Sequence, residues 1–194
     1  MERSAESVVA EVVRARRFEL VDAAGQVRAG LGAFSGGGES LMLLEPAGNP
    51  RVSLDLLPDG LAGVMLWDAV GQARVKLVVG PDGMPCLKLL DAAGRDRAVL
   101  GVDSNGNSGF VMCDAAGKRR AVLSALPDEG AVLVLYDAAG KMRTLLNAAG
   151  AAERGGLTLW GAAEKPLAGL GVSSDGTGVL GLYDGAGNVI WKAP

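Results

Sequence analysis

The sequence predicts an all-β protein made of eight antiparallel β-hairpin repeats of 23 residues, and three observations predict it. A phrase of the type VDAAG recurs, apolar residues alternate before and after it, and turn-forming residues separate the alternating stretches. The first position of the phrase recurs every 23 residues, with one interval of 24. It falls at Asp22, Glu45, Asp68, Asp91, Asp114, Asp137, Gly161 and Asp184. A repeat that covers nearly all 194 residues predicts one array rather than separate domains.

Two apolar columns precede each phrase, two and four residues before its first position, with a mixed column between them. The nearer column is Leu20, Leu43, Leu66, Leu89, Met112, Leu135, Leu159 and Leu182. A further leucine column lies nine residues after the first position, from Leu31 to Leu170. Alternation of period two is typical of half-buried strands, so each unit contributes two strands.

Each phrase is expected to form the hairpin turn between the two strands of its unit. An Asp at the first position accepts backbone hydrogen bonds, and a Gly at the fourth adopts positive φ, as in a type I turn closed by a glycine bulge. A second turn follows about fourteen residues later, for example at Pro58-Asp59-Gly60 and Ser104-Asn105-Gly106. The segment from Asp103 to Asn107 loosely resembles the start of a calcium loop, but Met112 stands where the bidentate Glu belongs, so a turn is predicted.

The first residues differ from the array. Residues 5–16 carry Val8, Val9, Val12 and Val13 on one helical face, which predicts a short N-terminal helix. This helix either plugs the end of the array or drives self-association. The chain is therefore divided into a helical lead at 1–17 and a single array at 18–194.

One continuous apolar face has to be hidden from water. The array is expected to coil into a solenoid, a prism or a flattened barrel, or several chains pack their faces together. A homo-oligomer is predicted, with a trimer as the first hypothesis. Strands of five to seven residues are too short for a membrane barrel, which needs about nine to eleven.

The segments Tyr136-Asp137-Ala138-Ala139-Gly140-Lys141 and Tyr183-Asp184-Gly185-Ala186-Gly187-Asn188 resemble the YD repeats of Rhs-type bacterial proteins. That resemblance implies hairpin units in a coiled strip. In the other units the tyrosine position holds Val21, Leu44, Trp67, Leu90, Cys113 and Trp160, and the downstream Thr of the family is mostly missing. The resemblance therefore supports coiled hairpins and implies no toxin.

Composition excludes several classes of function. The chain has no histidine, which removes the commonest general base and metal ligand, and no catalytic constellation, cofactor or metal site is predicted. The net charge of -3 argues against nucleic-acid binding, and no apolar run is long enough for a membrane-spanning helix. A cytoplasmic location is the default expectation, and the cell surface or secretion is the alternative if a leader has been removed. Cys86 and Cys113 are too far apart in the repeat for a disulfide, so free thiols are expected.

The candidate binding residues are arginines six positions after the first position of the phrase. They are Arg28, Arg51, Arg74, Arg97, Arg120 and Arg143, and the column ends with Leu167 and Ile190. Two strand separations, roughly 9 to 10 Å, would separate successive guanidinium groups. Such a row either binds an extended polyanion or pairs with the turn carboxylates and carbonyls of the array itself.

The sequence therefore favours a non-catalytic structural or scaffolding repeat protein, such as a stalk, a fibre segment or an assembly module. The alternative is a binding module for a glycan or polyanion, which uses the arginine row and exposed Trp67, Trp160 and Trp191.

Overall fold

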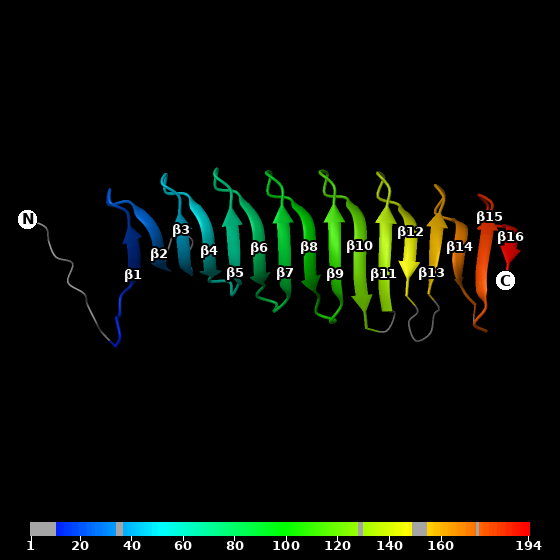
Figure 1. The fold of residues 1–194 in the computed structure, drawn as a ribbon, viewed down its shortest axis with the longest axis horizontal. Coiled ribbons are helices and arrows are strands. Elements are labelled where there is room, and N and C mark those ends of the chain that lie inside the picture. Colours follow the sequence, from blue (N-terminus) through cyan, green and yellow to red (C-terminus); the bar gives the residue numbers. More distant parts are fainter. Residues whose placement is uncertain (1–10, 34–36, 128–129, 149–154, 174) are drawn as a thin grey trace, which may run out of the picture.

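The computed structural model describes residues 11–33, 37–127, 130–148, 155–173 and 175–194. Over these residues the chain forms one antiparallel sheet of sixteen strands in sequence order (Figure 1). The strands are β1 (Arg17–Val21), β2 (Val27–Ala33), β3 (Glu39–Leu44), β4 (Pro50–Leu56), β5 (Ala62–Trp67), β6 (Ala73–Val79), β7 (Pro85–Leu90), β8 (Asp96–Val102), β9 (Ser108–Cys113), β10 (Arg119–Leu126), β11 (Gly130–Tyr136), β12 (Met142–Asn147), β13 (Gly156–Trp160), β14 (Pro166–Val172), β15 (Gly178–Tyr183) and β16 (Val189–Ala193). The prediction of eight antiparallel hairpins is confirmed.

The sheet is open, so the predicted closure into a solenoid, prism or flattened barrel is wrong for a single chain. Within the described sheet each strand contacts only its neighbours in the sequence. The arrows of the odd-numbered strands keep nearly one direction from β1 to β15, and β1 and β16 lie at opposite ends of the row (Figure 1). Because little rotation accumulates along the row, the two edge strands never meet.

The predicted N-terminal helix is absent from the part of it that the structure describes. Residues 11–16 form neither helix nor strand, and residues 5–10 lie outside the described residues. Val12 and Val13 are 70% and 60% exposed, so the apolar side of this segment has no surface to pack against. A helix of twelve residues without such packing is only marginally stable in water. The described residues contain no helix that is long and apolar enough to cross a membrane.

The turn that begins at Asp91 shows how the repeated phrase folds. The Asp91 carboxylate accepts hydrogen bonds from the backbone N–H groups of Ala93 at 2.9 Å and Arg95 at 3.1 Å. Gly94 adopts φ of 75° and donates its N–H to the Asp91 carbonyl at 3.0 Å. The ladder shifts register between Leu89 and Leu90, as expected for a hairpin closed by a glycine bulge.

The turns at the opposite edge of the sheet use the same geometry. The Asp103 carboxylate accepts the N–H groups of Asn105 at 2.9 Å and Asn107 at 3.0 Å, and Gly106 has φ of 80°. The segment from Asp103 to Asn107 is therefore a turn, as predicted. No cluster of three or more possible metal ligands occurs in the described part of the chain.

The two faces of the sheet differ in chemistry. We call one the apolar face; along its midline it carries Leu20, Leu31, Leu43, Leu54, Leu66, Leu77, Leu89, Leu100, Met112, Leu123, Leu135, Leu146, Leu159, Leu170 and Leu182. These fifteen side chains are 40% to 65% exposed. The opposite face, called the mixed face, carries the arginine row together with apolar and polar residues such as Trp67, Met65 and Ser53.

The most buried side chains of the single chain lie on the mixed face. Among the described residues, the large apolar side chains that are at most 8% exposed are those of Met65, Val78 and Leu90. The cross-strand partners of Met65 are Ser53 and Lys76, and those of Val78 are Gly63 and Cys86. The leucines of the apolar face, in contrast, have no second layer above them. The sequence predicted the leucine columns to be buried, and within one chain they are not.

We expect that removing one whole unit preserves the fold. Deletion of residues 91–113 joins Leu90 to Asp114 and keeps both strand alternation and turn phase. The variant should retain a β-sheet circular dichroism spectrum and one cooperative unfolding transition. It should be shorter than the wild type by roughly 9.5 Å, two strand spacings, in small-angle X-ray scattering.

The matched control is deletion of residues 91–112, which leaves one extra residue before the turn. Side chains of the preceding strand then face the wrong way, so this variant should lose the cooperative transition. Equal stability of the two deletions would contradict the inferred register.

Candidate functional site

The six arginines of the row lie where predicted, just after the hairpin turns and along one edge of the sheet. They belong to β2, β4, β6, β8, β10 and β12 and point to the mixed face. Their side chains are 27% to 47% exposed. The row is accessible to solvent, so the contacts of each guanidinium decide how it is used.

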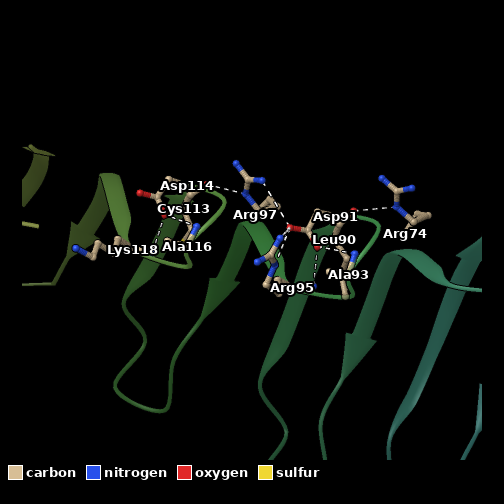
Figure 2. A network of polar contacts seen from close by, with 10 residues as sticks. All are labelled: Arg74, Leu90, Asp91, Ala93, Arg95, Arg97, Cys113, Asp114, Ala116 and Lys118. Atoms are coloured by element: carbon tan, nitrogen blue, oxygen red, sulfur yellow. Dashed lines mark hydrogen bonds and ion pairs between the residues drawn. The ribbon is translucent and has the colours of Figure 1, made fainter. Parts of the chain in front are cut away.

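Arg97 links its own turn to the turn of the next unit. Its Nε donates to the carbonyl of Cys113 at 2.9 Å, and its Nη1 lies 3.7 Å from the Asp91 carboxylate (Figure 2). The Asp91 carboxylate also receives Arg95 at 3.0 Å. One carboxylate therefore closes its own turn and holds the guanidinium that reaches the next turn.

The same arrangement recurs along the row. Arg51 and Arg74 donate from Nε to the carbonyls of Trp67 and Leu90, each at 3.0 Å. Arg120 and Arg143 bond to Asp114 and Asp137 of their own turns, and they donate to the carbonyls of Asp137 and Gly161 in the next. Arg28 lies 3.7 Å from Asp22, and its buried Nε has no hydrogen-bond partner.

Two units have no arginine at this position of the row. In the seventh unit Leu167 replaces the arginine, and Lys165 donates from Nζ to the carbonyl of Ala186 in the next turn at 2.6 Å. Ile190 lies in β16, the last strand of the described sheet. This geometry favours the structural interpretation of the row, and its use as a polyanion groove stays a prediction.

Several of the turn aspartates have a lowered pKa, which favours their ionised form. The hydrogen bond from the Lys141 N–H is the main cause that lowers the pKa of Asp137; partial burial opposes it, and Arg143 lowers it further. Asp68 has a lowered pKa for the same reasons, with Gln72 and Arg74 as partners. At the opposite edge of the sheet, the Ser173 hydroxyl is the main cause that lowers the pKa of Asp175 to about 2.

The three tryptophans do not share one exposed surface. Trp67 and Trp160 are half-buried on the mixed face. Trp191 is 47% exposed and lies opposite Leu182 on the apolar face. The prediction of three exposed tryptophans is wrong for Trp67 and Trp160: Nε1 of Trp67 reaches Ser53 on the neighbouring strand, and Nε1 of Trp160 is buried.

A buried polar cluster on the mixed face was not predicted. Asp55 is 9% exposed and accepts hydrogen bonds from the hydroxyls of Ser40 at 2.6 Å and Ser53 at 2.5 Å. Trp67 donates from Nε1 to the Ser53 hydroxyl at 3.2 Å. A hollow of about 470 Å³ lies beside this cluster. The signal in the sequence is the pair Ser53 and Asp55, two positions apart on one strand, where the next unit has Lys76 and Val78.

Both cysteines are free thiols, as predicted. Cys86 and Cys113 are half-buried on the mixed face.

No protein-family model matches the chain, and no curated protein matches it. Among solved structures, the chain is similar to the wild-type TCP10 domain of Danio rerio CPAP, determined in complex with a peptide of Danio rerio STIL. The match has 19% sequence identity and a TM-score of 0.26, and it covers 91% of this chain and 98% of that one. The resemblance to YD repeats stays a prediction.

Replacing Arg97 tests the link between units. Arg97→Ala removes the hydrogen bond to the Cys113 carbonyl and should lower the free energy of unfolding by about 1 kcal/mol, a modest value because the side chain is partly exposed. Arg97→Lys keeps the charge but loses the fixed Nε geometry, so it should recover only part of the loss. Urea unfolding curves measure both variants, and full recovery by lysine would show that charge alone matters.

Stability should fall in acid. The lowered pKa of a folded Asp means that its contribution is present above the unfolded pKa of about 3.9 and is lost as pH falls through the folded value. The melting temperature should therefore decrease from pH 5 to pH 2. In Asp137→Asn the amide oxygen still accepts the turn N–H groups, so this variant should lose less stability over that range. A melting temperature that is constant down to pH 2 would contradict the inferred role of the carboxylates.

Proposed function

We propose that this chain is a non-catalytic structural module, a stiff β-sheet strip that serves as a stalk, fibre segment or assembly module. The observation that carries the proposal is the link from turn to turn along one edge of the sheet, which is made at each junction from the second unit to the eighth. Arginine supplies it in the earlier units, and Lys165 supplies it where Leu167 has replaced arginine. The hydrogen bond to the next turn is therefore kept even where the cationic residue and its position in the unit change.

The acidic residues support the same function. The recurring turn carboxylates, such as those of Asp91 and Asp137, accept backbone N–H groups of their own turn and hold a guanidinium. Hydrogen bonds that satisfy both turn and arginine make each hairpin rigid relative to the next. An array of this kind provides length and a repeated surface.

The alternative is polyanion or glycan binding along the arginine row. Partial exposure of the six side chains favours it, because outward N–H groups remain available to a ligand. Chromatography on heparin at low salt tests it directly. Retention that is lost with rising salt and abolished by Arg74→Gln with Arg97→Gln would favour this alternative.

The proposed function predicts an elongated and stiff particle. Sixteen strands give a length of roughly 70 Å at about 4.8 Å per strand. Small-angle X-ray scattering should show this length, unchanged between low and high salt, and the protein should not bind heparin at low salt. A compact or flexible particle, or heparin affinity that depends on the arginine row, would contradict the structural role.

A further inference from the structure

The apolar face is the part of the molecule that one chain leaves incomplete. An apolar face can be hidden by closing the sheet or by packing against another molecule, and the sheet is open. Its fifteen midline side chains remain 40% to 65% exposed. With roughly 80 Å² exposed for each half-buried leucine-sized side chain, they present on the order of 1,200 Å² of apolar surface. Exposed apolar patches of monomers rarely exceed roughly 600 Å².

The residues of the apolar face are suited to an interface from which water is excluded. Its four central positions in each unit carry apolar side chains in every described unit, except for Thr144. The backbone groups beneath them are paired in the ladder, for example between Leu77 and Leu87 or between Leu123 and Leu133. Charges lie instead on the mixed face and at the turn edges, so a partner can cover this midline without burying an unpaired charge.

Two geometric properties indicate that the partner is another copy of this chain. Leucine rows recur every two strands, roughly 9.5 Å, and a second copy has this same spacing along its whole length. The strands also keep nearly one direction along the array (Figure 1). Long sheets with little twist are unusual and are typically stabilised by stacking or by side-chain ladders.

We propose that the apolar face is a homo-oligomeric interface, on which copies of this chain pack leucine rows against leucine rows. This inference rests on the proposed structural function and names its partner. The available area exceeds the roughly 800 Å² per partner of a standard stable interface. Two copies form a sandwich with sheets about 10 Å apart, and three copies enclose the same faces in a prism.

Light-scattering mass in solution tests the interface. The wild type should have a mass two or three times the chain mass of 19.7 kDa at micromolar concentration. Leu123→Lys with Leu146→Lys places charges on the apolar face and should weaken association at least tenfold. The matched control, Val122→Lys with Leu145→Lys, uses the adjacent residues on the mixed face and should leave the oligomeric mass unchanged.

Cross-linking keeps the test decisive if a lysine variant fails to fold. In a background of Cys86→Ser with Cys113→Ser, a cysteine at Leu123→Cys should give covalent oligomers with a bis-maleimide that reaches about 10 Å, the spacing of packed sheets. Val122→Cys on the mixed face should not.

A monomeric wild type at tens of micromolar, or equal cross-linking from both faces, would overturn the inference. In the first case a lipid surface or a different protein becomes the occupant of the face. The scattering length of the strip separates this failure from failure of the proposed function, because a monomer can still be a stiff strip of roughly 70 Å.

Discussion

The turn carboxylate is the interaction on which the rest of the structure depends. In the unit that starts at Asp91, one carboxylate accepts two backbone N–H groups and thereby fixes the loop that Gly94 closes with positive φ. The loop sets the pairing of Leu89 with Ala98, and a slip by one residue would move every side chain to the opposite face. The same carboxylate lies beside Arg97, which reaches the next unit. One residue, Asp91, therefore determines the strand register, decides which side chains lie on each face, and helps to connect its unit to the next.

The two faces differ in how far a single chain buries their side chains, because alternating positions of each strand carry different residue types. On the mixed face, long side chains such as Met65 and Trp67 cover neighbouring strands, and the buried Asp55 finds two hydroxyl donors. Most buried polar groups there have partners within the chain, as burial requires, and the exceptions in the described part of the chain are Nε of Arg28 and Nε1 of Trp160. Leucine on the other face gains contacts only from the strands beside it, because nothing lies above it. A single chain therefore satisfies the mixed face and the turn edge, and leaves the leucine rows exposed.

Local patterns predicted much of the fold, and long-range geometry explains what they missed. The 23-residue repeat, the sixteen strands and the turns follow from alternation and from Asp and Gly at fixed positions. Closure of the sheet depends on twist that accumulates over many strands, and the sequence of a single unit does not reveal this twist. Residues 11–16 of the predicted helix are not helical, and their Val12 and Val13 have no packing surface. The burial of Trp67 depends on neighbours one strand away, such as Ser53. For the arginine row, the sequence placed every residue and left two interpretations, which differ only in atomic contacts such as that of Arg97 with Cys113.

The topology also decides how stability is distributed. Each unit contacts only the units before and after it, so a single chain behaves as a nearly one-dimensional array with nearest-neighbour coupling. In such an array a weak unit can open locally, and the link from Arg97 to Cys113 strengthens only one junction. Contact along the whole apolar face would instead engage all units at once, because each leucine row belongs to a different unit. Turn chemistry thus builds the strip unit by unit, and packing of its leucine rows would make the strip unfold as one body.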